Sequence, residues 1–175
     1  MNICSQCGGS KIKVIKDKPY NYDECGLNVI LNGLNQYECE ECKEHFVSIP
    51  KVKQLHRVIG ISLCKEKKGL LTAQEIKFLR KDLRFKAKEL AQLLGVTPQT
   101  VSRWENNKKR IGEGQDRLLR SIYMLYASEQ ADKPCYGFVK MFSSLPSPRK
   151  EFTPSAINLN PPDWLSGFPP ELCSA

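Results

Sequence analysis

Two cysteine pairs offer the clearest chemistry in this 175-residue sequence. The pairs are Cys4 with Cys7 and Cys39 with Cys42. A Cys-x-x-Cys turn can direct two thiolates at one centre about 2.3 Å away, and two such turns complete the tetrahedral four-sulfur shell that Zn²⁺ favours. Such a shell leaves no position open for a substrate, so the sequence predicts one structural zinc ion per chain. Gly8 suits the turn after the first pair, whereas Lys43 is less apt for the turn after the second.

Other uses of the cysteines stay open on the residues alone. Either pair could be a thioredoxin-like redox motif, although neither opens a helix after a strand. The thiols could also be free and buried, and Cys25 could replace one zinc ligand. His45 and His56 are expected to be surface or packing side chains, because four thiolates already close the shell. The N-terminus has no charged region followed by an apolar run, so we expect a reducing, cytoplasmic setting without a disulfide framework.

A second pattern is the run ELAQLLGVTPQTVSRWE, which begins at Glu89. Ala91 is small where two helices would cross, Gly95 suits the turn between them, and Val101 packs the second helix onto the first. This is the pattern of a helix-turn-helix, whose second helix enters a DNA major groove. Side chains off the packed face, or at helix starts near phosphates, are the predicted DNA contacts. They are Lys86, Thr97, Gln99, Thr100, Ser102, Arg103 and Asn106.

The distribution of charge agrees with a polyanionic partner. Residues 61–130 carry 15 Lys/Arg against 8 Asp/Glu, whereas residues 1–60 carry 8 against 7 and residues 131–175 carry 4 against 4. The excess positive charge therefore coincides with the helix-turn-helix pattern. A solvated basic surface or a helical pair that binds no DNA is the plainer alternative. No apolar stretch reaches the roughly 18–20 residues that span a bilayer, so we expect no membrane partner.

The elements around these groups predict an α+β multidomain chain. Residues 1–49 are expected to form a small β-rich Cys4 zinc module, with a strand over 11–15 and a hairpin that joins 29–31 to 34–37 through Asn32-Gly33. Such a unit is too small for a convincing core, so a metal would have to staple it.

The remaining segments are read from periodicity and caps. Residues 50–70 predict a linker helix over 51–66 and a polar hinge at 65–69. Residues 71–130 predict an all-α helix-turn-helix domain whose first helix starts at the capping box Thr72-Ala-Gln-Glu75. Its third helix starts at Thr97-Pro98, and its last, over 115–128, has a broad apolar face that suggests a homodimer on a palindromic site. Residues 131–175 hold 8 of the 11 prolines and predict an extended tail.

Longer stretches of the sequence resemble known families. The run ELAQLLGVTPQTVSRWENN resembles the Xre/Cro-type helix-turn-helix. Together with CSQCGGS, GLNVILNGLNQYECEEC and LTAQEIKFLRK, it makes about residues 1–127 similar to the MqsA (YgiT-type) zinc-finger antitoxin family. The resemblance implies an N-terminal zinc domain that holds a toxin and a C-terminal DNA-binding domain that dimerises and represses its own operon.

The resemblance also implies roles for individual residues. The zinc ligands of the family fall on the four paired cysteines, and its two base-reading positions fall on Gln99 and Arg103. Gln99 departs from the Asn of the best-known member, so an operator sequence does not carry over. The proline-rich residues 131–175 lie outside the pattern of the family.

The leading interpretation is a sequence-specific antitoxin that binds a palindromic double-stranded operator and neutralises a small, ribonuclease-like toxin. A free-standing, zinc-containing Xre-family regulator is the alternative. An enzyme that uses Cys25 with a histidine lacks a group to activate the nucleophile, and an RNA-binding zinc ribbon is disfavoured because the positive charge avoids residues 1–60. An acidic run could face a basic toxin cleft or be a solvated surface. The run is Glu38, Glu40, Glu41 and Glu44.

Overall fold

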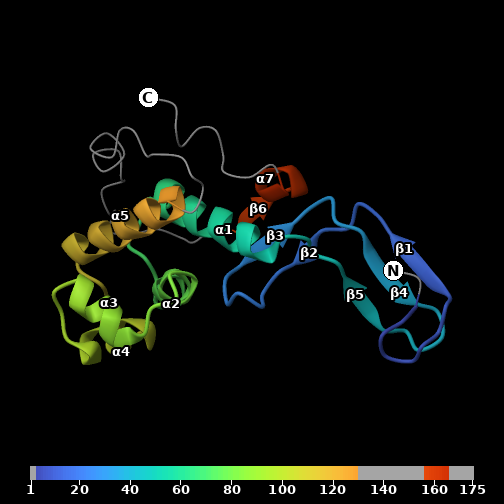
Figure 1. Ribbon diagram of the computed structural model, residues 1–175, viewed down its shortest axis with the longest axis horizontal. Coiled ribbons are helices and arrows are strands. Elements are labelled where there is room, and N and C mark those ends of the chain that lie inside the picture. The colour runs from blue at the N-terminus through green and yellow to red at the C-terminus, as the bar shows by residue number, and fades with distance from the viewer. Residues whose placement is uncertain (1–2, 130–155, 166–175) are drawn as a thin grey trace.

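The computed structural model describes residues 3–129 and 156–165. A small sheet forms one end of an elongated molecule, and a group of helices forms the other (Figure 1). One long helix and a second small sheet lie between these two ends. The predicted α+β architecture is therefore confirmed, with β structure first along the chain and helices after it.

The first sheet has the order β1–β4–β5, and the second cysteine pair starts at Cys39, the last residue of its central strand β4. Its strands are β1 (Ile12–Ile15), β4 (Gln36–Cys39) and β5 (His45–Val47), and both pairings are antiparallel. The strand predicted over 11–15 is thus present. Cys39 is the one fully buried residue of the three strands, and Val14 of β1 is 46% exposed. This sheet has almost no apolar core.

The second sheet has the order β2–β3–β6. Its strands are β2 (Tyr20–Asn21), β3 (Val29–Leu31) and β6 (Ile157–Leu159), with β2 antiparallel and β6 parallel to β3. The predicted hairpin of 29–31 with 34–37 is wrong. Gly33 does adopt a positive φ of 70°, but the chain after it crosses to the first sheet, because β6 and β2 already occupy the two edges of β3.

The C-terminal residues 156–165 are part of the folded body. After β6, the short helix α7 (Pro161–Leu165) places Trp164 in a fully buried position, where its indole N–H donates to the Pro50 carbonyl at 3.1 Å. The N–H of Asn32 donates to the Leu159 carbonyl at 2.8 Å. The extended tail predicted for 131–175 therefore does not hold for these ten residues, which bury an aromatic anchor of the kind that supplies much core energy.

Five helices follow the first sheet. They are α1 (Val52–Glu66), α2 (Ala73–Asp82), α3 (Ala87–Leu93), α4 (Pro98–Glu105) and α5 (Glu113–Glu129). These bounds confirm the predicted helices to within a few residues, and α2 begins at the capping box formed by Thr72 and Glu75. One continuous apolar core joins the helices to the second sheet, with Leu31 of β3 and Leu55 of α1 both fully buried.

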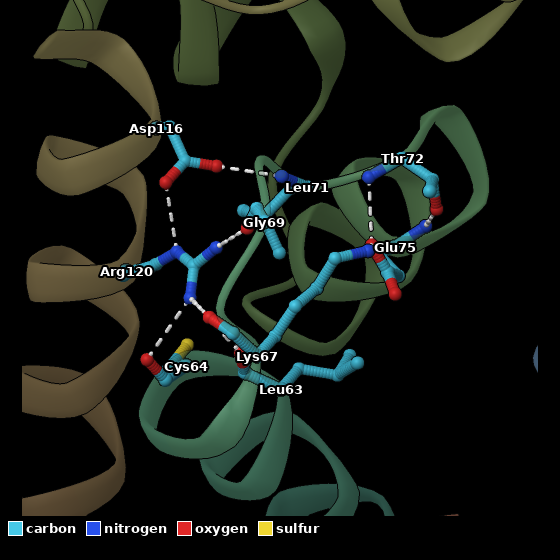
Figure 2. Close-up of polar contacts among 9 residues, drawn as sticks. All are labelled: Leu63, Cys64, Lys67, Gly69, Leu71, Thr72, Glu75, Asp116 and Arg120. Atoms are coloured by element: carbon cyan, nitrogen blue, oxygen red, sulfur yellow. Dashed lines mark hydrogen bonds and ion pairs between the residues drawn. The ribbon is translucent and has the colours of Figure 1, made fainter. Parts of the chain in front are cut away.

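The segment between α1 and α2 is held by one buried arginine (Figure 2). Arg120 of α5 is 1% exposed and donates to four backbone carbonyls, at 2.6 to 3.3 Å. These carbonyls belong to Leu63, Cys64, Lys67 and Gly69. The guanidinium thus satisfies carbonyls that the end of α1 would leave unpaired. Residues 65–69 do not form the free hinge that their polar sequence predicts.

Two ion pairs also hold the segment between α1 and α2, one of Arg120 with Asp116 and one of Lys67 with Glu75. Asp116 accepts from Arg120 at 2.8 Å and from the Leu71 N–H at 2.7 Å. Lys67 forms a buried ion pair with Glu75, whose carboxylate also caps the Thr72 N–H at 2.6 Å. Figure 2 shows these groups as one network that joins α1, α2 and α5. The linker helix is therefore packed into the helical body.

Candidate metal centre and nucleic-acid interface

The four paired cysteines meet at one point. Their Sγ atoms all lie within 4.8 Å of one another, and two of the distances are 3.6 Å, from Cys4 to Cys42 and from Cys7 to Cys39. A regular tetrahedron with metal–sulfur bonds of about 2.3 Å has edges of about 3.8 Å, so the spacing fits a four-thiolate metal site. Each close contact joins one cysteine of the first pair to one of the second. The cluster could therefore hold a metal ion that ties the two turns together.

The two turns that carry the cysteines are equivalent. In the first, the N–H of Gly8 donates to the Cys4 carbonyl at 2.9 Å, and Gly8 has a φ of 76°. In the second, the N–H of Lys43 donates to the Cys39 carbonyl at 2.9 Å, and Lys43 has a φ of 62°. The sequence suggested that Lys43 is less apt for this turn, yet it adopts the same left-handed conformation, at the steric cost that a non-glycine residue has there.

The pKa values of Cys4 and Cys42 are shifted in opposite directions. Hydrogen bonds from the backbone N–H groups of Cys7 and Gln6 lower the pKa of Cys4 to about 7. The Glu44 N–H favours the thiolate of Cys42, but desolvation and the neighbouring sulfurs outweigh it and raise that pKa to about 12. Four adjacent thiolates repel one another unless a cation neutralises them. All four groups could therefore be thiolates together only with a cation bound among them, as in a metal site.

The second site is built on α3 and α4. Thr97 caps α4 by accepting from the Thr100 N–H at 3.2 Å, and Pro98 takes the first helical position. Gly95, with a φ of 64°, makes the turn between the helices. Asn107 takes the left-handed conformation after α4, with a φ of 56°. The predicted start of this helix at Thr97-Pro98 is thus confirmed, for the reasons that the residue types supplied.

The orientation of α4 follows from two buried side chains. Val101 is fully buried, as the sequence predicts, and Trp104 is nearly so. Arg80 of α2 fixes the C-terminal end through a two-point ion pair with Glu105, at 2.5 and 2.9 Å. Four of the seven predicted DNA-contact residues then lie exposed along the outer face of α4 and its C-terminal end. They are Gln99, Ser102, Arg103 and Asn106.

The remaining predicted contacts are placed less simply. Thr100 is half-buried, and its hydroxyl lies 3.0 Å from that of Thr97, which is exposed but engaged in capping. The side-chain amide of Asn106 donates to the Ser102 carbonyl at 2.8 Å. Lys86 is exposed before α3, but its N–H donates to the Glu89 carboxylate at 2.7 Å, so an acidic group already occupies that helix start.

The DNA contacts predicted from the sequence do not include a basic loop that follows α4. Lys108, Lys109 and Arg110 follow the helix after Asn106 and Asn107, and all three are exposed. Three consecutive cations next to a recognition helix are suited to phosphate groups. Their position in the sequence, shortly after the recognition helix, was the signal that could have identified them.

Comparison with known families agrees with the second site. A family model described as Helix-turn-helix matches residues 76–113, which run from α2 into the start of α5. This family contains DNA-binding regulators that are generally not enzymes. No curated protein and no solved structure matches the chain. Among the described helices, none is both long and apolar enough to cross a membrane.

Proposed function

We propose that this protein is a sequence-specific DNA-binding transcription regulator that inserts α4 into the major groove. The observation that carries the proposal is the outer face of α4, whose polar side chains are exposed while Val101 and Trp104 hold the opposite face. The helix-turn-helix match covers the same residues.

Two side chains are proposed to read bases. Gln99 and Arg103 lie one helical turn apart and so face neighbouring base pairs. Gln suits the N6 and N7 atoms of adenine and Arg suits the O6 and N7 atoms of guanine, each with about 1–3 kcal/mol of discrimination. Hydrogen bonds to the phosphates would come from polar and basic residues in and around the helix. The proposed phosphate contacts are Lys86, Thr97, Thr100, Ser102, Asn106, Lys108, Lys109 and Arg110.

We further propose a homodimer on a palindromic site. Leu118 and Leu125 on α5 are 39% and 38% exposed, and Ile122 lies half-buried between them in the same helical row. A partly exposed apolar row of this kind is a candidate for a two-fold interface, in which the same residues meet on both subunits. Half-sites about one turn of DNA apart would follow from that symmetry.

The metal in the cysteine cluster is proposed to be Zn²⁺. Four thiolates in a closed tetrahedral arrangement are typical of structural zinc, and no ligand position remains for chemistry. Metal analysis of the purified full chain should find one zinc per chain. A preparation that is folded and metal-free, with all of its thiols titratable, would contradict the assignment.

The DNA proposal is tested with an Arg103→Ala variant. DNA sites selected from a random pool by the parent protein give the operator, and binding is then measured over a range of salt concentrations. Arg103→Ala should lose the preference for the selected site but keep salt-sensitive, non-specific affinity. The matched control is Lys109→Ala, which should weaken binding to all sequences about equally. The proposal is wrong if Arg103→Ala retains the parent's preference for the selected site.

Antitoxin activity is a second candidate, supported by the first sheet. Within the described residues, β1 and β5 each pair on one side only, so both edges can accept a strand from another chain. Glu40, Glu41 and Glu44 are exposed beside the second turn and could steer a basic, ribonuclease-like toxin. Co-expression of the full chain with a small protein encoded beside its gene tests this. If the chain binds its operator but neither co-purifies with that protein nor relieves its toxicity, the free-standing regulator stands.

A further inference from the structure

A cavity of about 520 Å³ lies where the second sheet meets the helices. The loop between β2 and β3 contributes one wall, the first turns of α1 contribute a second, and α2 contributes a third. Its volume falls in the range of small-molecule sites, which are about 300–1,000 Å³. It is separate from both the cysteine cluster and the outer face of α4, and no proposed function above uses it.

The charged groups of this cavity are unevenly paired. Four cations line it, namely Lys53, Lys77, Lys81 and Arg84, and none of the ion pairs found among the described residues includes them. Its two carboxylates each accept a hydrogen bond from a tyrosine hydroxyl and keep their negative charge. Glu24 accepts from the Tyr20 hydroxyl at 2.7 Å, and Asp82 accepts from the Tyr123 hydroxyl at 2.6 Å. Four cations against two carboxylates leave the lining with an excess of positive charge, which favours an incoming anion.

The cavity also has an apolar side. Phe78 is buried in its wall, and the imidazole of His56 lies edge-on to that ring with centroids 5.7 Å apart. Val52 is 39% exposed at the same cavity. Burial lowers the pKa of His56, so its ring is neutral near pH 7 and adds no further positive charge to the lining. Cations and an apolar wall together are suited to an organic anion with a ring or chain.

The backbone conformation of Arg84 is a further observation in favour of an anion site. Arg84 follows the end of α2 with a φ of 59°, a position where helices usually carry glycine because a side chain is strained there. Here the residue is an arginine that lines the cavity. The chain therefore carries an arginine where a glycine would make the local backbone more stable.

We propose that this cavity is a binding site for a small organic anion, one that places an acidic group among Lys77, Lys81 and Arg84 and an apolar ring or chain against Phe78 and Val52. A hollow with an apolar wall suits a small molecule better than the convex DNA backbone, which needs only exposed cations. The ligand would bridge α1 and α2. The same helix α2 holds the recognition helix α4, because Arg80 of α2 pairs with Glu105 of α4. The site therefore lies on the helix that positions α4.

The probe for the test is 8-anilinonaphthalene-1-sulfonate, which combines one acidic group with aromatic rings and fluoresces when bound. The full chain should bind it saturably, with one probe per chain, and should unfold at a higher temperature in its presence. The test variant is Lys77→Gln/Lys81→Gln/Arg84→Gly, in which glycine suits the positive φ. This variant should bind the probe about tenfold more weakly or worse, as expected when charged hydrogen bonds are lost.

A matched control removes the same charge elsewhere. Lys13→Gln/Lys16→Gln/Lys65→Gln changes three exposed lysines that do not line the cavity, and it should bind the probe as the parent does. A second variant, Val52→Asp, adds a carboxylate to the lining at the first turn of α1, where an acidic residue favours the helix. It should weaken probe binding without lowering the unfolding temperature.

Two results would overturn the proposal. One is probe binding that is unsaturable, or that is unchanged in the triple variant and in Val52→Asp. The other is a triple variant that binds the probe normally but binds operator DNA more weakly, which would assign these cations to the phosphate backbone. Because probe binding needs no DNA, a failure of the proposed regulator function would leave this result intact.

Discussion

The two three-stranded sheets are similar in size but are stabilised by different means. In β1–β4–β5 the strands bury little apolar surface, and the sulfurs of the two cysteine turns take the place of a core. In β2–β3–β6 the central strand buries Val29 and Leu31 in the core that it shares with the helices, and Trp164 of α7 is fully buried in the same core. One sheet is therefore expected to depend on a metal ion, and the other on the hydrophobic effect.

We infer from this difference a boundary between the metal-dependent part and the helical body that differs from the one predicted from the sequence. The sequence suggests one zinc module over residues 1–49, but β2 and β3 belong to the helical body by their packing. The cysteine turns, β1 and β4 contribute no described side chain to the core of that body, and β5 contributes only Val47, which is half-buried against it. Loss of the metal should therefore unfold a smaller part of the protein than 1–49.

The largest expected effect is that of Cys39→Ser. This residue is buried in β4 and its Sγ lies 3.6 Å from that of Cys7, so its loss opens the four-sulfur shell. Metal binding in small zinc modules supplies on the order of 10 kcal/mol, which this sheet has no apolar core to replace. Hydrogen exchange should show β1, β4 and β5 unprotected, with β3 and the helices still protected.

The matched control for this variant is Cys25→Ser. Cys25 lies in the loop after β2, on the side of the second sheet, and is not part of the cluster. It should retain the metal and full protection of the first sheet. If Cys39→Ser also unprotects β3, the two sheets form one cooperative unit and the comparison fails.

An intermediate effect is expected from Trp164→Ala, which acts on the other sheet. Truncation of a fully buried tryptophan costs about 3–5 kcal/mol and leaves a cavity between α7 and α1. The Pro50 carbonyl also loses its donor. Urea unfolding monitored by helical circular dichroism should shift to lower denaturant, while the zinc content per chain stays that of the parent. A loss of metal in parallel would contradict the independence of the two parts.

The fold could be predicted wherever a local rule had no competitor. The capping box at Thr72, the cap and proline at Thr97-Pro98 and the cysteine pairs each specify their own neighbourhood. The hairpin after β3 failed because Asn32-Gly33 indicates a turn but not the strand that pairs next. That strand is β6, more than a hundred residues further along the chain, and no local pattern reveals it.

The sites were predictable to the same extent. The exposed face of α4 follows from its helical period, so Gln99 and Arg103 could be singled out in advance. The cavity beside α2 could not, because its walls come from three separate segments whose meeting depends on tertiary packing. The carbonyls that Arg120 binds are likewise invisible in a sequence, where residues 65–69 show only charge and glycine.

The smallest expected effect is the pH dependence contributed by His56, which lies where the second sheet meets the helices. Its Nε2 lies 2.7 Å from the Tyr22 hydroxyl, and burial lowers its pKa below the ordinary 6.5, although the charge of Asp82 opposes the shift. The unfolded chain therefore takes up this proton first as the pH falls. The stabilising contribution is fully present above about pH 6.5 and decreases as the pH drops through that value toward the lower pKa of the folded state.

This contribution can be separated from that of the metal centre, which also weakens in acid because its thiolates take up protons. Urea unfolding of the helices at about pH 5.5 and about pH 7.5 gives the change in stability for the parent, for His56→Gln and for the control His45→Gln. His45 is exposed on β5, so its variant should keep the parent's pH dependence. His56→Gln should show a smaller loss of stability at the lower pH, since it has no imidazole to protonate. Equal losses in all three proteins would mean that His56 carries no such linkage and that the acid sensitivity of the second sheet arises elsewhere.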